Sequence, residues 1–259
     1  MSFYESREPM TAVPLKADER IDQLYSQTIQ IIQSPTVFSF SLDAVLLGDF
    51  SQVPVAAKTQ MVDLCAGTGA VGLFVSAKTR GHITEVELQP RLADMAARSI
   101  ILNDLTDRLS VLNEDLLTIT KRIKKDSIDV VLCNPPYFKD QPTSKKNPNP
   151  HLAIARHEIS ANLDQIMTVT SELLKTNGKA YFVHRPERLD DLFATMRAHQ
   201  LAPKRLRFVH PKADREANMV LIEMIKSGRP NGVRILPPVI VYQADGSYGE
   251  EVHKLLYGN

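Results

Sequence analysis

The sequence has no tryptophan, only two cysteines and no long apolar run. A membrane-spanning helix needs about 20 consecutive apolar residues, and no run in this chain approaches that length. The first residues carry acids and lack an apolar core, so we expect no secretory signal there. Cys65 and Cys133 each fall at the end of an apolar run, which favours buried free thiols over a disulfide. These absences predict a cytoplasmic protein without a membrane partner.

An excess of charge is also missing, because 31 Lys and Arg residues stand against 30 Asp and Glu, a net charge of +1. Any nucleic-acid contact must therefore come from a local basic patch. The seven histidines and two cysteines do not show the spacing of metal ligands, so we expect no metal. With 43% apolar residues in 259, the composition is that of an ordinary folded protein.

Short apolar runs alternate with helix-period segments through the middle of the chain, which is typical of βαβ units. We expect seven strands, at residues 60–64, 81–88, 109–113, 127–133, 179–184, 205–210 and 219–226. We expect helices at residues 41–50, 70–78, 91–105, 162–175 and 187–199. The prediction is an α/β fold with a Rossmann-like, doubly wound seven-stranded sheet. It is mostly parallel, its last strand is antiparallel, and helices cover both faces.

We divide the chain into an N-terminal extension at residues 1–57, a central domain at 58–227 and a C-terminal extension at 228–259. The C-terminal extension is expected to hold a strand or hairpin and a short helix. Residues 138–156 are rich in Pro, Asn and Lys, and loops of that length in compact domains are usually functional or disordered. We interpret this segment as a lid.

The motif Asn134-Pro135-Pro136-Tyr137 ends the apolar run at 129–133. Its two prolines remove successive backbone donors and stop the strand. The Asn134 amide and the Pro135 carbonyl then offer two acceptors, with the Tyr137 ring beyond them. These groups suit a planar substrate whose exocyclic –NH2 must face an electrophile, such as a methyl donor.

A glycine-rich turn follows the expected strand at 60–64. Gly67 and Gly69 let a ligand approach the backbone, and the helix after them offers free N–H groups. Asp63, before the turn, would repel a pyrophosphate but suits the amino group of a zwitterionic ligand. An ordinary strand-to-helix turn remains the alternative.

Two more acids follow later strands. Glu87 comes about 20 residues after the glycine turn, where an acid accepts hydrogen bonds from ribose hydroxyls. Asp115 follows the third strand, at a place suited to an adenine amino group. Alone, each is also an ordinary solvated acid. Their order at successive strand ends favours one shared site, because ligands of open α/β sheets bind at the carboxyl ends.

With these motifs the chain resembles the class I S-adenosylmethionine-dependent methyltransferases, within them the amino-methylating group with an Asn-Pro-Pro-Tyr motif. The resemblance implies S-adenosylmethionine as cofactor and an N-terminal extension packed on its site. Its methionine part would lie at Asp63, Gly67 and Gly69, its ribose at Glu87 and its adenine at Asp115. Further cofactor contacts are implied for Cys65, Leu88, Leu116, Ser41 and Asp43.

The same resemblance implies that Asn134 and the Pro135 carbonyl bind the target amine while Tyr137 stacks on the target ring. Residues 31–47 are similar to the N-terminal signature of the bacterial tRNA1(Val) adenine-N6 methyltransferases. Residues 151–158, 184–186 and 210–218 resemble segments of the Gram-positive branch of that family. Its members act on the adenosine just 3′ of the anticodon, so the resemblance implies a tRNA substrate.

Contact with RNA requires positive charge near the site. Our candidates for RNA or substrate contact are Lys145, Lys146, His157, His184, Lys212 and Arg215. Each is also explained as a solvated or packed side chain. The sequence leaves the oligomeric state open, as a monomer or a weak dimer.

Other targets present a conjugated –NH2 as well. Glutamine-amide N5 methylation of a release factor is one alternative, although such enzymes usually carry an N-terminal helical domain. DNA adenine methylation usually needs a separate recognition region, and guanine-N2 enzymes tend to have Phe where Tyr137 stands. A non-catalytic cofactor-binding module is the alternative from another class.

Overall fold

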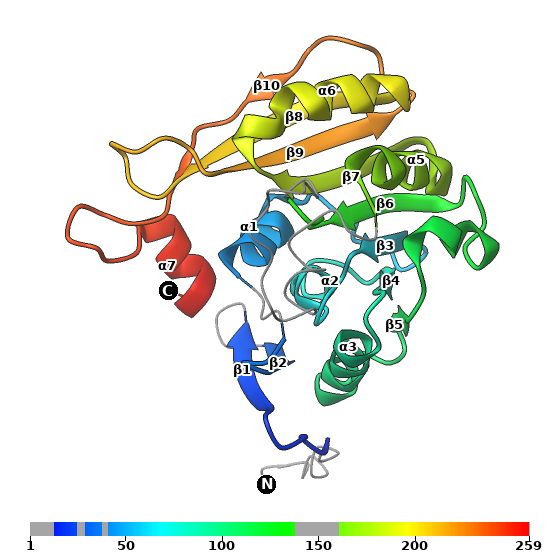
Figure 1. Cartoon of the computed structure of the whole chain (residues 1–259), viewed down its shortest axis with the longest axis vertical. Helices are drawn as coiled ribbons and strands as arrows, with labels where there is room; N and C mark the ends of the chain where they lie inside the picture. Colours follow the sequence, from blue (N-terminus) through cyan, green and yellow to red (C-terminus); the bar gives the residue numbers. More distant parts are fainter. Residues whose placement is uncertain (1–12, 25–28, 38–40, 138–160, 259) are drawn as a thin grey trace, which may run out of the picture.

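The structure is a computed structural model that describes residues 13–24, 29–37, 41–137 and 161–258. In these residues one sheet has nine strands, in the order β10-β8-β9-β7-β6-β3-β4-β5 with β11 beside β8 (Figure 1). Its strands are β3 (Gln60–Leu64), β4 (His82–Val86), β5 (Leu109–Leu112), β6 (Ile128–Cys133), β7 (Leu174–His184), β8 (Leu201–His210), β9 (Met219–Lys226), β10 (Arg234–Ile235) and β11 (Val239–Ile240).

The pairing of the strands confirms the expected fold class, but the sheet has nine strands where seven were expected, because β10 and β11 also pair with β8. Strands β3, β4, β5, β6 and β7 pair in parallel. Strand β9 pairs antiparallel with both β7 and β8. The helices are α1 (Leu42–Phe50), α2 (Ala70–Ser76), α3 (Pro90–Leu102), α5 (Leu163–Leu173), α6 (Leu189–Ala198) and α7 (Glu250–Tyr257), with 3-10 turns η1 (Leu116–Lys121) and η2 (Pro186–Arg188).

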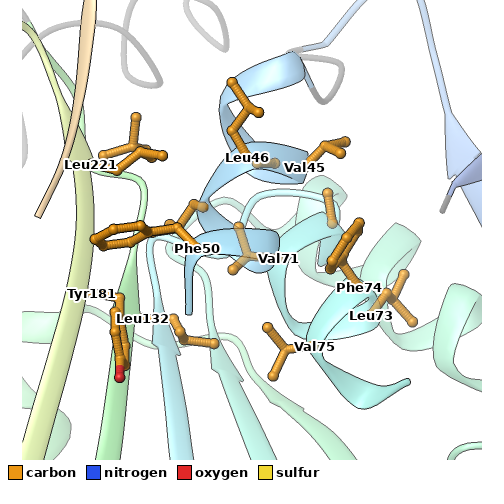
Figure 2. Packing of buried hydrophobic residues seen from close by; sticks show 14 of the residues in the cluster. Val45, Leu46, Phe50, Val71, Leu73, Phe74, Val75, Leu132, Tyr181 and Leu221 are labelled. Carbon is orange, nitrogen blue, oxygen red and sulfur yellow. The ribbon is translucent and has the colours of Figure 1, made fainter. Parts of the chain in front are cut away.

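The central strands are buried on both faces, because successive side chains of a strand point to opposite sides. In β6, Val130 and Leu132 join the core under α1 and α2, whereas Val131 and Cys133 join the core under α5 and α6. Figure 2 shows the first of these cores, where Phe50 of α1 lies against Tyr181 of β7. The continuous apolar runs of the sequence follow from this double burial.

A second sheet precedes α1, and the sequence did not predict it. Strands β1 (Arg20–Leu24) and β2 (Ile29–Gln33) form an antiparallel pair that packs on α3. The Ile32 N–H donates to Ser99 Oγ at 2.9 Å, and Arg98 donates to both carboxylate oxygens of Glu19 at 2.7 Å. The hairpin depends on these long-range contacts with α3, which its own residues do not reveal.

Several expected boundaries were wrong: the strands expected at 179–184 and 205–210 begin earlier, at Leu174 and Leu201, and the helix expected at 91–105 ends at Leu102. The helix expected at 162–175 ends at Leu173, and β7 begins at Leu174. Asn177, at φ +64°, lies within β7 and does not end the helix. The pairing of β6 with β7 shifts register at this place, so the left-handed residue accommodates a bulge.

Both extensions contact the central sheet. Ala44 lies in the core on the α2 face, and Gln33 Nε2 donates to Thr68 Oγ1 of the glycine turn at 2.8 Å. At the other end of the chain, β10 and β11 each pair in parallel with β8, and α7 follows them. Within the described ranges, no helix has the length and apolar character to span a bilayer.

Candidate active site

A pocket lies at the carboxyl ends of the parallel strands. Its walls come from the glycine turn after β3, the end of β4, the turn after β5 and the motif after β6. It includes six residues that the sequence assigned to a cofactor and one assigned to the target amine. These are Cys65, Gly67, Glu87, Leu88, Asp115, Leu116 and Asn134.

The glycine turn is shaped by left-handed backbone at Cys65 (φ +59°), Gly67 (φ +59°) and Gly69 (φ +84°). A Cβ on Gly67 would meet no described atom within 4 Å, so this residue faces open space at the pocket. A Cβ on Gly69 would lie 2.6 Å from Glu85 Oε2. Gly69 is therefore required both by its φ and by the acid packed behind it.

Glu87 lines the pocket and holds its backbone in place. Its Oε2 accepts from the Gly67 N–H and its Oε1 from the Gln89 N–H, both at 2.8 Å. Burial raises the pKa of Glu87 and these backbone donors lower it in part. Each carboxylate oxygen has two lone pairs, so Glu87 keeps acceptor capacity for ligand hydroxyls.

Asp115 also combines a local and a pocket role. Its Oδ1 accepts from the Leu117 N–H at 2.9 Å, which caps η1. The residue lines the pocket together with Leu116 and Glu114. The cap fixes the Asp115 carboxylate beside the pocket.

Asp63 lies beneath the glycine turn and is not among the residues described as lining the pocket. It is 1% exposed, and its Oδ2 accepts from the Gly72 N–H at 3.0 Å. Its Oδ1 and both oxygens of the neighbouring Glu85 have no hydrogen-bond partner among the described residues. Burial raises the pKa of Asp63 to about 8. The contact of Asp63 with a ligand amino group stays a prediction.

The motif after β6 is held by side chains from distant elements. The Tyr137 hydroxyl lies 2.7 Å from Asp43 Oδ2 and 2.5 Å from Asn134 Oδ1. Arg188 of η2 donates to the Tyr137 carbonyl at 3.1 Å. Asn134 and Pro136 line the pocket, whereas Tyr137 is half-buried behind them and packs against the core.

His184, at the end of β7, packs against the Tyr137 ring with centroids 5.5 Å apart. Its Nδ1 accepts from the Arg185 N–H at 2.9 Å, so Nε2 carries the proton of the neutral ring. Nε2 has no partner in the described part of the chain. Burial, with the charge of Arg188, lowers the pKa of His184 to about 4. The histidine is therefore neutral at pH 7.

Besides Asp63 and Gly69, which lie at the glycine turn outside the described lining, two residues assigned to the cofactor come from the chain before β3. Asp43 contacts Tyr137, and Ser41 Oγ is buried without a partner among the described residues. The described pocket lining includes neither of them. Sequence reasoning also missed other residues at the site, among them Thr68, Pro136 and Arg188. The sequence could have identified Pro136, because it directly follows the two acceptors, Asn134 and Pro135, in the same motif.

The candidate RNA contacts other than His184 fall into two groups. Lys145, Lys146, His157 and the expected lid lie outside the described residues. Lys212 and Arg215 lie in the connection between β8 and β9, where Lys212 donates to the Ala244 carbonyl at 3.3 Å and Arg215 is exposed. Neither residue is part of the pocket as the structure describes it.

No group of three or more metal-ligating side chains occurs in the described parts of the chain. The pocket instead offers buried carboxylate acceptors, an open glycine backbone and apolar walls from Val86, Leu88 and Leu92. This donor set fits a nucleoside with hydroxyls and an exocyclic amine. Asn134 adds an amide at the same cavity, in reach of a second, amine-bearing ligand.

Comparison with known proteins identifies the family. The model of the methyltransferase small domain matches residues 28–199. A tRNA1(Val) (adenine(37)-N6)-methyltransferase of Porphyromonas gingivalis is 26% identical over 235 residues, which are 87% of this chain and 89% of that protein. The enzyme of the same name from Aliivibrio fischeri is 33% identical over 144 residues. That alignment spans 55% of this chain and only 58% of the relative.

A solved structure shows the same fold. A predicted O-methyltransferase of Agrobacterium tumefaciens superposes with a TM-score of 0.66 at 21% identity. The match covers 83% of this chain and 96% of the other.

Proposed function

The chain belongs to the methyltransferase small domain family, and from this we propose that it methylates the N6 amine of an adenine in tRNA. It is an S-adenosylmethionine-dependent methyltransferase. The observation that carries the finer proposal is the opening of Asn134 and Pro136 into the pocket that Gly67, Glu87 and Asp115 line. One cavity thus joins a cofactor site to an acceptor for an amine.

The pocket fits S-adenosylmethionine by the chemistry of its residues. Glu87 would accept from the ribose hydroxyls and Asp115 from the adenine amino group, while the Gly67 backbone would lie along the methionine part. When bound, the cofactor supplies an electrophilic methyl group on a sulfonium. The roles of these residues, and of Cys65, Leu88 and Leu116 as further walls, are part of the proposal.

The chemistry asked of the chain is to present an amine. The lone pair of an exocyclic adenine amine is delocalised into the ring, which makes the nitrogen a poor nucleophile. Hydrogen bonds from its protons to Asn134 Oδ1 and the Pro135 carbonyl would favour a tetrahedral nitrogen with an exposed lone pair. Most of the rate would come from such positioning and electrostatics.

No strong base is needed, because the nitrogen becomes far more acidic once it is methylated. His184 is neutral, and Nδ1, the ring nitrogen that could accept a proton, already accepts a hydrogen bond from the Arg185 backbone N–H. The proposal therefore does not use His184 as a base. The base must leave its stack to reach the pocket. Tyr137, half-buried next to the lining residue Pro136, would then stack on it, as the sequence resemblance implies.

The tRNA substrate rests on the relatives in Porphyromonas gingivalis and Aliivibrio fischeri, both named for adenine-N6 methylation of tRNA1(Val). The sequence resemblance at residues 31–47 supports the same substrate. The resemblance at residues 210–218 supports membership of the Gram-positive branch. The domain boundaries at 57 and 227 belong to the proposal as well. The glutamine-amide, guanine-N2 and DNA-adenine targets are the competing substrates.

The test is methyl transfer from labelled cofactor to total tRNA that lacks the modification, followed by nucleoside analysis. We expect N6-methyladenosine next to the anticodon. The matched control is the same tRNA with purine, which has no exocyclic amine, at the target position, and it should stay unlabelled. Label in guanosine, or transfer to DNA or to a release factor in parallel reactions with none to tRNA, would overturn the adenine-in-tRNA assignment.

A further inference from the structure

A chain of hydrogen bonds connects α1 to the amine-binding motif. The Tyr137 hydroxyl lies within bonding distance of the Asp43 carboxylate (2.7 Å) and of the Asn134 amide (2.5 Å). Asp43 and Tyr137 are 94 residues apart in the sequence. Of the three residues, only Asn134 is described as lining the pocket. Asp43 therefore reaches the pocket through Tyr137.

The Tyr137 hydroxyl has one proton, too few to donate to both of its oxygen neighbours. A tyrosine hydroxyl has one proton and donates one hydrogen bond, yet both of its partners present an oxygen. An ionised carboxylate cannot donate, so the hydroxyl proton must go to Asp43. Asn134 satisfies the tyrosine oxygen only by turning its amide so that Nδ2 donates to it. That rotation directs Oδ1 away from Tyr137.

We propose that Asp43 is a positioning residue, which acts through Tyr137 to turn the Asn134 amide so that its Oδ1 is free to accept from the target amine. The proposal rests on the proposed function of Asn134. An amide that kept Oδ1 on the hydroxyl would present its –NH2 to the substrate. Two donors would then face one another, and the amine would lose its acceptor.

The surroundings of Tyr137 keep this polarity fixed. Burial, with the negative charge of Asp43 and its hydrogen bond, raises the pKa of Tyr137 well above the ordinary value. The hydroxyl therefore stays a donor across the physiological range. Arg188 holds the Tyr137 carbonyl and His184 packs on the ring, so the tyrosine has little freedom to turn away from Asp43.

The first test needs no substrate and therefore stands whether or not tRNA is the target. Tyrosine labelled with 13C in the ring reports the pKa of Tyr137 by NMR, and Tyr137→Phe assigns its signal. We expect Asp43→Asn to lower that pKa by at least one unit, because it removes the adjacent negative charge. Asp49→Asn, on the same helix, is the matched control and should leave it unchanged. An unchanged pKa in Asp43→Asn would overturn the proposal.

The second test is a double-mutant cycle in methyl transfer. In Asp43→Asn the side chain at position 43 is no longer an obligate acceptor, because an amide can also donate to the tyrosine oxygen, and the hydroxyl proton is then free to go to Asn134 Oδ1 and block it. This variant should therefore lower kcat about 100-fold, more than Tyr137→Phe, which only releases the Asn134 amide. The double variant should recover the kcat of Tyr137→Phe alone, with cofactor Kd unchanged in all three.

Two results would contradict the positioning role. Losses that multiply in the double variant would show that Asp43 acts independently of Tyr137. A raised cofactor Kd in Asp43→Asn would return Asp43 to the cofactor site. If the wild-type protein transfers no methyl group to tRNA, the proposed substrate fails, and the NMR titration still decides whether Asp43 controls Tyr137.

Discussion

The two halves of the pocket are built in different ways. The half at the ends of β3, β4 and β5 is formed by turns whose acids bond to nearby backbone, as Glu87 does to Gly67 and Gln89. The half at the ends of β6 and β7 is formed by side chains from distant elements that converge on Tyr137. Local turns thus shape the half that we propose binds the cofactor (the cofactor half), and tertiary contacts shape the half that we propose binds the amine (the amine half).

This difference predicts which variants change the affinity for the cofactor and which change the rate of the chemical step. Removing a contact in the cofactor half should weaken affinity for the cofactor and leave the chemical step intact. Removing a contact in the amine half should slow the chemical step and leave cofactor affinity intact. The expectation follows because interactions made only with the reacting amine stabilise the transition state.

The largest effect is expected for Asn134→Ala. The substitution removes the acceptor for the target amine and also a partner of Tyr137. We expect kcat to fall about 10²- to 10³-fold, as for loss of one key donor or acceptor in an active site. Cofactor Kd, measured by calorimetry, should change less than threefold. An unchanged kcat would refute the assigned role, and a large rise in Kd would erase the distinction between the two halves.

The same difference decides how much the sequence could predict. Glu87, Asp115 and the glycine turn were placed at one site from the order of strands and motifs alone, and the structure brings them together. Asp43 was assigned to the cofactor only through the resemblance of residues 31–47, which include it, and that role stays a prediction. Its contact with Tyr137 depends on how α1 packs on the sheet, which no local pattern encodes.

The β1–β2 hairpin was missed for the same physical reason. Its strands are short and carry polar residues, so their alternation does not stand out. Their pairing becomes favourable only against α3, where Ser99 and Asn103 accept from the backbone of β2. By contrast β6, buried on both faces, was found within one residue of its observed start.

A middle-sized effect is expected for Glu87→Gln. The Gly67 and Gln89 N–H groups bond to different oxygens of Glu87, so glutamine would place its –NH2, a donor, against one of these two N–H donors. We expect cofactor Kd to rise about 10- to 100-fold while kcat at saturating cofactor stays within about fivefold.

The matched control for this prediction is Glu85→Gln on the same strand. Glu85 is buried behind Gly69 and is not among the residues described as lining the pocket, and burial raises its pKa, so this glutamine replaces a carboxyl with no assigned ligand contact. Its cofactor Kd should be unchanged. Equal losses in the two variants would mean that strand packing, and not the ligand contact of Glu87, controls affinity.

The smallest effect concerns His184 and the stability of the amine half. Its pKa lies near 4 in the folded protein, against 6.5 for the unperturbed side chain, mainly because it is buried. As pH falls below 6.5 the unfolded chain binds a proton that the folded chain does not, so stability decreases towards pH 4. Between pH 6.5 and 5.5 the loss should be about 1 kcal/mol.

Denaturant titrations of two variants test this pH dependence. In His184→Asn, the Oδ1 can replace Nδ1 as acceptor for Arg185, and the loss of stability between pH 6.5 and 5.5 should disappear. In the control His82→Asn, at an exposed position, the loss should remain. An identical pH slope in the wild type and His184→Asn would show that His184 does not titrate as a buried neutral group.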